Sequence, residues 1–249
     1  MTADWIRSRL HFLRHSPAHP QWRAFVAKRN LVQWVRTRAY GAVLDIGCGN
    51  ADTGQNLPAA SSYVSMDLLR TGAVLYNSSP TIWATASAIP VRPNCADTVL
   101  LLDVLEHLPA PATAIDEAAR VLKPGGQLLL SVPFLYPTHD APYDYQRWTL
   151  HGLRKLLSAR GLSLEEVRCQ GTGLETAILL LNIALAGHAL AWVQRKSVLL
   201  LLIPFVMMMV LFSNLVAGLA ARLARPSDFM PFSVWLVASK TGTGTSEVA

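Results

Sequence analysis

The sequence predicts an α/β fold in which a mostly parallel sheet is covered by helices on both faces. Short apolar runs alternate with longer amphipathic segments between residues 42 and 169, an order typical of βαβ units. The first apolar run, Val43 to Ile46, passes directly into Gly47-Cys48-Gly49, a turn that lets a ligand approach the backbone closely. A length of 249 residues, 51% of them hydrophobic and 15% charged, fits one such domain with an apolar appendage.

Apolar spacing and Gly or Pro punctuation predict the elements in order. Residues 20–39 predict a helix, because Pro20 suits a first turn and apolar side chains then recur at helical spacing. The remaining helices are expected to begin near residues 51, 68, 111 and 149. The predicted strands are 42–46, 62–66, 81–84, 97–102, 126–132 and 162–169.

Capping and turn residues bound two of these elements. Lys123-Pro124-Gly125-Gly126 predicts a helix stop and a turn immediately before the strand at 126–132. Thr149 is expected to cap a helix over 150–160, and Gly161 is expected to follow its end.

Two long apolar runs follow the predicted sixth strand. Thr176 to Gln194 is uncharged and mostly apolar, and after Arg195 and Lys196 the run from Ser197 to Ala221 holds 25 residues without a charge. The second run exceeds the roughly 20 apolar residues that cross a bilayer, and the first is of borderline length. A strand-like segment, Phe232–Lys240, comes after them.

The net charge of +6 is concentrated near the N-terminus. Such a basic arm suits anionic lipid, nucleic acid or an acidic substrate. The cysteines Cys48, Cys95 and Cys169 lack metal-ligand spacing and are interpreted as reduced thiols, and no signal peptide is predicted. Within residues 1–39 a single acid, Asp4, stands against eight basic residues: Arg7, Arg9, Arg14, Arg23, Lys28, Arg29, Arg36 and Arg38.

Five sequence blocks carry a family resemblance. They are Asp45-Ile46-Gly47-Cys48-Gly49, Ser61 to Leu68, Thr85 to Val91, Ala96 to Leu108 and Glu117 to Leu128. Together they resemble the motifs of class I S-adenosylmethionine-dependent methyltransferases, especially the type 11 group, over residues 43–169. The resemblance implies a Rossmann-like sheet of seven strands with the last one antiparallel, S-adenosyl-L-methionine as cofactor, and methyl transfer.

The resemblance implies a cofactor site at the carboxyl ends of the strands. Asp45, Gly47 and Gly49 would border the methionine end of the cofactor, and Ala86 and Ser87 would lie near adenine. Asp67 ends a strand, where its carboxylate can accept both ribose hydroxyls; the alternative is an acid that favours a helix N-terminus. The complete predicted set is Asp45, Gly47, Cys48, Gly49, Asp67, Leu68, Ala86, Ser87 and Asp103.

Some positions depart from known patterns. Ala51 replaces the third glycine of the family's first motif, and Thr85 stands where the family frequently has an Asp that contacts adenine. Backbone groups or Ser87 are the expected substitutes there. The dinucleotide fingerprint Gly-x-Gly-x-x-Gly also fails, because Asp52 occupies the position of its third glycine.

The loop from His139 to Thr149 is the predicted acceptor site. It follows the fifth strand, where open α/β sheets bind ligands, and it resembles the Pro-Tyr-Asp-x-x-Arg-x-Thr segment of many family members. His139 is the first candidate for a general base and His107 the second, and no metal is predicted. The alternative is a structural lid in which an arginine pairs with a neighbouring carboxylate. The predicted substrate contacts are Tyr143, Asp144 and Arg147.

About 60 residues separate the sixth strand from the last one, so the apolar region is interpreted as an insertion. Two membrane crossings would place Arg195 and Lys196 at the far side, against the positive-inside tendency. A shallow hairpin in the near leaflet, helices that cover the sheet, or a dimer interface are the alternatives. The predicted domains are a basic helical arm (1–40), the methyltransferase domain (41–173 and 230–240), the hydrophobic insertion (174–225) and a flexible tail (241–249).

The sequence therefore predicts a membrane-associated methyltransferase on the cytoplasmic side, acting on a lipid-linked or amphipathic small molecule. One alternative is an acceptor that is a soluble small molecule or a sugar. Another is a non-catalytic, membrane-anchored binding module with a methyltransferase fold. No nucleic-acid partner is expected, because Asp103-Val104-Leu105-Glu106 stands where a base methyltransferase would have Asn/Asp-Pro-Pro-Tyr. A homodimer remains open.

Overall fold

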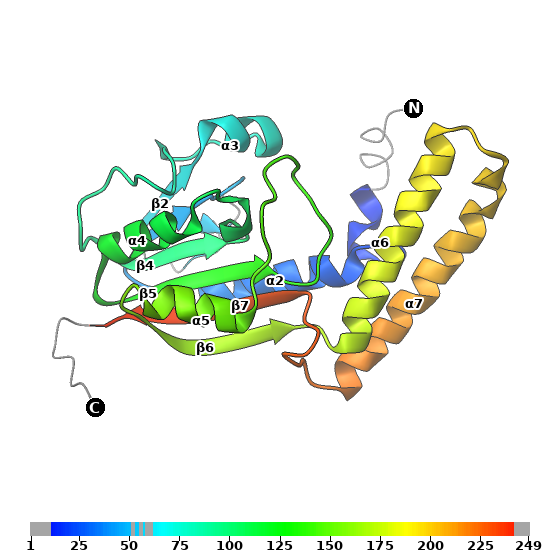
Figure 1. Cartoon of the computed structure of the whole chain (residues 1–249). Coiled ribbons are helices and arrows are strands. Elements are labelled where there is room, and N and C mark those ends of the chain that lie inside the picture. Colours follow the sequence, from blue (N-terminus) through cyan, green and yellow to red (C-terminus); the bar gives the residue numbers. More distant parts are fainter. Residues whose placement is uncertain (1–10, 51–52, 55–56, 58–61, 242–249) are drawn as a thin grey trace. The chain divides into compact units, whose positions relative to one another are not determined.

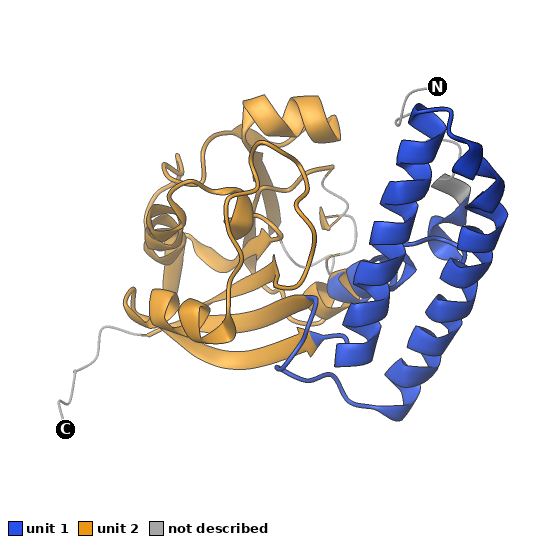
Figure 2. Cartoon of the chain, turned by 45° about the vertical axis from the view of Figure 1, so that its right-hand side comes forward, with its two compact units in different colours: residues 1–31, 170–232 blue, residues 32–169, 233–249 orange. Residues whose placement is uncertain are grey.

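The computed structural model describes residues 11–50, 53–54, 57 and 62–241. The chain divides into two compact units (Figure 2). We call residues 32–169 and 233–249 the sheet unit, and residues 1–31 and 170–232 the hairpin unit. The boundary falls within helix α2 (Trp22–Arg36), and each unit is described by itself.

One seven-stranded sheet organises the sheet unit (Figure 1). Its strand order is β3-β2-β1-β4-β5-β7-β6. The pairs β1–β2, β1–β4, β2–β3 and β4–β5 are parallel, and β7 runs antiparallel to β5. This confirms the predicted fold class. The strands are β1 (Ala42–Ile46), β2 (Ser62–Asp67), β3 (Ile82–Trp83), β4 (Ala96–Leu102), β5 (Leu122–Pro133), β6 (Leu162–Gln170) and β7 (Ser233–Lys240).

The central strands are continuous apolar runs because they are buried on both faces. Val99, Leu100 and Leu101 of β4 are all 0% exposed, as are Leu128 and Leu130 of β5. Each fully buried leucine of this kind contributes about 1.5–3 kcal/mol to folding. These two strands form the rigid centre from which the site residues project.

Helices α3 (Leu69–Tyr76), α4 (Pro111–Val121) and α5 (Leu150–Ser158) belong to the sheet unit, together with the short 3-10 helix η3 (Leu105–His107). The predicted cap of α5 is confirmed, because Thr149 Oγ1 accepts a hydrogen bond from the backbone N–H of Gly152 at 3.1 Å. The helix predicted near residue 51 falls largely outside the described residues.

The prediction of a turn at Lys123-Pro124-Gly125-Gly126 is wrong, because these residues lie inside β5. In the β4–β5 ladder, Ala96 pairs with Leu122 and the next pair is Thr98 with Gln127. The four residues 123–126 of β5 therefore have no partner in this ladder and form a bulge. Gly125 adopts a φ of 75°, which suits glycine. The ammonium of Lys123 anchors the bulge through an ion pair with Asp97 at 2.7 Å.

The hairpin unit contains two long apolar helices that lie side by side (Figure 1). They are α6 (Gly173–Gln194) and α7 (Ile203–Leu223), joined through Arg195, Lys196 and the 3-10 helix η4 (Val198–Leu202). Thr172 and Glu175 form a reciprocal capping box at the start of α6. Glu175 also pairs with Arg23 of α2.

A buried polar contact joins these two helices at mid-length. Asn182 Nδ2 donates to Asn214 Oδ1 at 3.1 Å, and Ser213 Oγ donates to Asn182 Oδ1 at 2.7 Å. Asn214 Nδ2 in turn donates to the carbonyl oxygens of Pro17 and His19, which follow the 3-10 helix η1 (His11–His15). The polar side chains are therefore satisfied inside the unit, and the outward surface is left apolar.

That outward surface carries large apolar side chains. Phe205, Met208 and Phe212 are 54%, 60% and 69% exposed, and Leu219 is 55% exposed. By length and composition, Gly173–Gln194 and Val198–Leu223 are each long and apolar enough to cross a membrane. Soluble monomers rarely expose an apolar surface of this extent, so lipid or protein is expected to cover it.

Candidate active site

Three carboxylates lie at one edge of the sheet. Asp45 is in β1, Asp67 ends β2, and Asp103 directly follows β4. The parallel register places Ile46 beside both Met66 and Leu101, so the three strands end together. Ligands of open α/β sheets bind at this edge, and negative charge here suits a cationic sulfonium cofactor.

Two glycines shape the turn after β1. Gly47 adopts a φ of 72°, and its N–H donates to the carbonyl of Met66 at 2.8 Å. A Cβ at Gly47 would lie 2.5 Å from Val104 Cγ2, so a larger residue does not fit. Gly49 adopts a φ of 55°, and a Cβ there would lie 4.0 Å from Tyr76 Cγ, the nearest atom among the described residues. Because Gly49 has no side chain, a ligand can approach the backbone at this position.

Asp67 connects this turn to α3. Its carboxylate accepts hydrogen bonds from the backbone N–H of Gly49 at 2.9 Å and from the backbone N–H of Leu68, the next residue, at 2.7 Å. Burial raises the pKa of Asp67 despite these bonds. A carboxylate offers about four lone-pair positions, so two remain for a pair of ribose hydroxyls. The residues present therefore fit the ribose of an adenosine cofactor.

Asp45 is buried and is held by a side chain of the neighbouring strand. It is 2% exposed, and its carboxylate accepts the Tyr63 hydroxyl at 2.6 Å. Burial, moderated by that bond, raises the pKa of Asp45 to about 6. Asp45 thus supports the floor of the turn. Its partner Tyr63 lies in the block Ser61 to Leu68, but the sequence did not show that its hydroxyl contacts Asp45.

The other predicted cofactor contacts surround this turn. Leu68 is 43% exposed, while Ala86 is buried and Ser87 is half-buried. Burial raises the pKa of Cys48 to about 11, so this thiol is a poor nucleophile at neutral pH. Asp103 accepts the Ser131 hydroxyl at 2.8 Å and adopts a φ of 55°, a left-handed conformation uncommon outside glycine.

The loop after β5 is tied to η3 by backbone contacts. Tyr145 N–H donates to the carbonyl of Glu106 at 3.0 Å. Gln146 Nε2 donates to the carbonyls of Leu105 and Leu108 at 3.1 and 3.0 Å. These bonds bring together two segments that are more than 30 residues apart in the chain.

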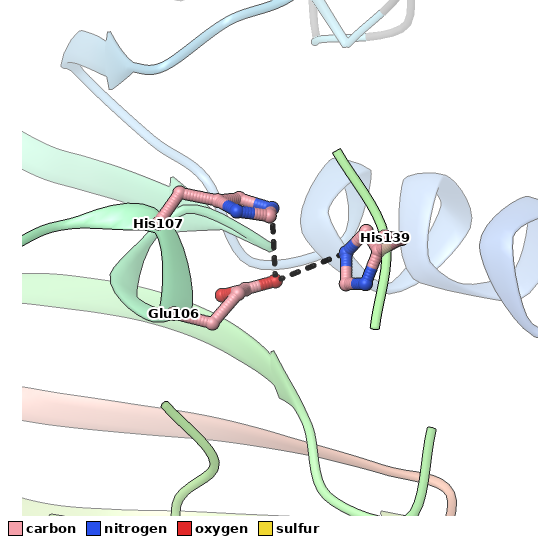
Figure 3. Close-up of side chains that lie close together, drawn as sticks. All are labelled: Glu106, His107 and His139. Carbon is pink, nitrogen blue, oxygen red and sulfur yellow. Dashed lines mark ion pairs between the residues drawn. The ribbon is translucent and has the colours of Figure 1, made fainter. Parts of the chain in front are cut away.

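Both predicted general bases meet at this junction (Figure 3). The rings of His107 and His139 contact edge to face, with centroids 4.9 Å apart. Between them lies Glu106, whose Oε1 is 3.7 Å from His107 Nε2 and 3.9 Å from His139 Nε2. Ligand-type atoms of the three side chains all lie within 4.8 Å of one another. The absence of a metal stays a prediction.

Glu106 is a site residue that sequence reasoning missed. It is 0% exposed, and neither of its carboxylate oxygens has a hydrogen-bond partner among the described residues. Such a buried, unpartnered acid is rare and marks a functional site or a bound ion or water. Its position directly before His107 was the available signal, but its burial was not visible in the sequence.

Asp144 and Arg147 form an ion pair within the loop that carries His139. Arg147 Nη2 donates to Asp144 Oδ2 at 2.7 Å in a two-pronged ion pair that lowers the pKa of Asp144 to about 2. Asp144 also accepts the backbone N–H of His139 at 2.9 Å. The carbonyl of Tyr143 contacts His107 Nδ1 at 3.1 Å. This pairing is the one expected of a structural lid, and it holds both histidines in place; substrate contact by these three residues stays a prediction.

Comparisons with known proteins bear on this site. Residues 44–130 match the type 11 family model described as a methyltransferase domain. The chain is 34% identical over 113 residues to the ubiquinone biosynthesis O-methyltransferase of Thiobacillus denitrificans, covering 40% of this chain and 49% of that protein. The protein of the same name from Pseudomonas aeruginosa is 34% identical over 151 residues, which cover 51% and 63% of the two chains. The chain thus spans about half the length of the curated relatives it matches.

Two solved structures share the fold. One is the [4+2]-cyclase SpnF, with a TM-score of 0.54, 18% identity, and coverage of 88% of this chain and 82% of that chain. The other is the 1,6-didemethyltoxoflavin-N1-methyltransferase of Burkholderia thailandensis with bound S-adenosylhomocysteine, with a TM-score of 0.50, 14% identity and coverage of 86% and 77%. At such identities these likenesses show the fold alone. The family match over residues 44–130, the strand order and the glycine turn together identify an S-adenosylmethionine-dependent methyltransferase domain in this chain.

Proposed function

We propose that this protein is a membrane-associated methyltransferase on the cytoplasmic side, acting on a hydroxyl of a lipid-linked or amphipathic small molecule. The observation that carries the proposal is that one chain combines the cofactor-type strand edge with two exposed apolar helices of membrane-spanning length. The curated relatives, named for O-methylation in ubiquinone biosynthesis, support a hydroxyl on an amphipathic acceptor.

The chain's own residues have defined tasks in this proposal. When bound, the cofactor supplies an electrophilic methyl group. Asp67 holds the ribose, and the backbone at Gly49 receives the methionine end. His139 and His107 lie beyond the carboxyl ends of the strands, and each can accept a proton from a hydroxyl. The remaining contribution is alignment of the acceptor oxygen with the methyl group.

Fractionation combined with a methylation assay tests the proposal. Expressed full-length chain is expected in the membrane fraction, and lipid extracts incubated with it and radiolabelled S-adenosylmethionine are expected to gain label. Asp67→Ala serves as the control that abolishes labelling without changing the fractionation. Protein found wholly in the soluble fraction, or label transferred only to water-soluble molecules, would contradict the lipid acceptor.

A second candidate is a non-catalytic, membrane-anchored module. It is favoured by Thr85 at the position where the family frequently has an acid that contacts adenine, and by the use of this fold in a cyclase. S-adenosylhomocysteine at millimolar concentration is expected to raise the melting temperature of an active enzyme. A melting temperature that does not change with this ligand would favour the module.

A further inference from the structure

The two active-site histidines are oriented by carbonyl oxygens. His107 Nδ1 contacts the carbonyl of Tyr143 at 3.1 Å, and His139 Nδ1 contacts the carbonyl of Pro137 at 3.2 Å. A carbonyl oxygen only accepts, so each Nδ1 carries the hydrogen. Each neutral ring therefore presents a lone pair at Nε2.

Both Nε2 atoms face the same carboxylate (Figure 3). Glu106 Oε1 lies 3.7 Å from one and 3.9 Å from the other, and no hydrogen-bond donor reaches Glu106 from the described residues. The Glu106 carboxylate and the two Nε2 lone pairs are therefore three hydrogen-bond acceptors that face one another, and Glu106 is not accessible to solvent. Such an arrangement is unfavourable until a positive charge or a proton enters it.

We propose that Glu106, His107 and His139 act as one group that takes up a single proton, held at one Nε2 or on Glu106, and that this is the proton a hydroxyl acceptor loses on methylation. The second part rests on the function proposed above. His139 is 29% exposed and His107 18%, whereas Glu106 is 0% exposed. An acceptor can reach the imidazoles but not Glu106, which is therefore a positioning residue that acts through them.

The proton and electrons balance in this step. The acceptor O–H bond breaks as its proton forms an N–H bond at one Nε2. The acceptor oxygen forms its new bond to the methyl group while the sulfur–methyl bond breaks and sulfur keeps that electron pair. Glu106 then neutralises the imidazolium, either as its counter-ion or by taking the proton itself, so no charge is left without a partner in the buried site.

Two other acids also face the imidazoles, and each has a second partner. Asp144 Oδ2 lies 3.3 Å from His139 Nδ1 and pairs with Arg147 on the same loop. Asp140 Oδ2 lies 3.9 Å from His107 Nε2 and accepts a hydrogen bond from Tyr76 of α3. Asp103, after β4, raises the pKa of Glu106 further, although burial is the larger cause. Tyr136 lies against the far side of His139, with ring centroids 5.5 Å apart, and burial raises its pKa to about 12, so it is uncharged at neutral pH. Burial lowers the pKa of His107.

Proton binding by the histidines tests the proposal without any acceptor. Full-length chain with ¹⁵N-labelled histidine, in detergent with S-adenosylhomocysteine, is titrated by NMR. The two histidines are expected to share one common midpoint of proton binding. Glu106→Gln is expected to weaken proton binding at His107 and His139 about tenfold or more, a downward shift of about one pKa unit, and Glu106→Asp is expected to restore part of it.

Two controls separate this role from a structural one. The exposed His151 of α5 supplies a reference resonance, and Asp140→Asn, which removes a half-buried acid near His107, is expected to shift the midpoint less than Glu106→Gln. Unchanged midpoints in a folded Glu106→Gln protein that still binds S-adenosylhomocysteine would overturn the proposal. So would a stoichiometric metal ion in the purified protein that Glu106→Gln removes, because a cation would then occupy the place of the proton.

Different results would contradict the single shared proton and the hydroxyl acceptor. A lipid extract that gains no label, with the NMR shift intact, removes the hydroxyl acceptor but leaves the shared proton. With a methylatable extract, the acid limb of the pH–rate profile is expected to move to lower pH in Glu106→Gln while the limiting rate falls. A rate loss with no movement of the limb would assign Glu106 a structural role and overturn its part in catalysis.

Discussion

At the scale of single residues, burial decides what each acid of the site does. Asp45, Asp67 and Glu106 are all nearly inaccessible, yet only Asp45 and Asp67 have hydrogen-bond donors. A carboxylate with donors is an anchor or a ligand contact, whereas one without donors is a proton site. The three roles therefore differ although the residue type is almost the same.

Asp45→Asn is expected to stabilise the ligand-free protein at neutral pH. The folded pKa of about 6 lies above the unfolded value of 3.8, so the folded state holds this proton more tightly. The free energy of unfolding consequently falls as pH rises from about 4 to about 6 and stays at the lower level above that. The amide removes this loss, up to about 3 kcal/mol at pH 7. Thermal unfolding from pH 4 to 8 measures it.

The matched control is Asp97→Asn, for which the opposite sign is expected. The hydrogen bond from Lys123 lowers the pKa of Asp97, so its charge stabilises the protein at neutral pH. An Asp45→Asn protein that is less stable than the parent at pH 7 would contradict the burial argument.

Asp67→Asn is expected to weaken S-adenosylhomocysteine binding about 100-fold. Two hydrogen bonds to a charged acceptor contribute about 1.5–3 kcal/mol each, and part of that is retained by the amide. Isothermal titration calorimetry of the full-length chain provides the affinity. A change of less than about threefold would remove Asp67 from the ribose site.

At the scale of elements, the positions of the site residues depend more on turns and bulges than on helix or strand propensity. The turn at Gly47 follows β1 and packs against Val104. The bulge at Gly125 allows β5 to continue through Lys123–Gly126, four residues that normally end a strand. Both depend on a positive φ at glycine. The loop carrying His139 is fixed by Gln146 and Arg147 and not by regular secondary structure.

Gly47→Ala is expected to destabilise the sheet unit by more than about 1 kcal/mol and to abolish cofactor binding, because the methyl group meets Val104 and the positive φ strains an alanine. Gly187→Ala in α6 is the matched control. Nothing lies within 4 Å of a Cβ at Gly187, so alanine there is expected to stabilise its helix by about 0.5–1 kcal/mol. Thermal melts with and without S-adenosylhomocysteine compare the two; equal effects would contradict this reading of the turn.

At the scale of the whole molecule, apolar surface is distributed unequally between the two units. The hairpin unit satisfies its polar side chains internally and exposes a row of large apolar ones, including Phe212 and Leu219. The sheet unit has exposed apolar residues too, such as Val74 on α3, but no helix of membrane-spanning character among its described residues. Membrane attachment is thus expected to depend on the hairpin unit alone.

The double variant Phe212→Glu/Leu219→Glu is expected to move the protein from the membrane fraction to the soluble one. A charged side chain near the centre of a membrane helix, where Phe212 lies, costs about 2.5–3.5 kcal/mol, and the second charge at Leu219 adds to it. Val74→Glu, at a position 78% exposed, is the control and is expected to remain with the membrane. Carbonate-washed membranes provide the measurement. Retention of the double variant would favour burial of the hairpin against protein.

Local patterns made much of the site predictable. Asp45, Gly47 and Asp67 stand at strand ends that apolar runs mark in the sequence, and the structure places all three at one edge. Phe232–Lys240 was expected to be the last strand, and β7 (Ser233–Lys240) pairs antiparallel with β5. The helix stop predicted at Lys123–Gly126 agrees with the end of α4 at Val121, but these residues form a bulge within β5 and not a separate turn before it.

The sequence by itself determined the order of elements, the class of cofactor and the apolar character of the insertion, because each depends on residues that are close together in the chain. Only the tertiary structure decided the surroundings of the acids. It placed Tyr63 on Asp45, and His139 beside Glu106 and His107. Burial and long-range contacts determine whether a carboxylate holds a charge, a ribose or a proton, and no local pattern in the chain contains them.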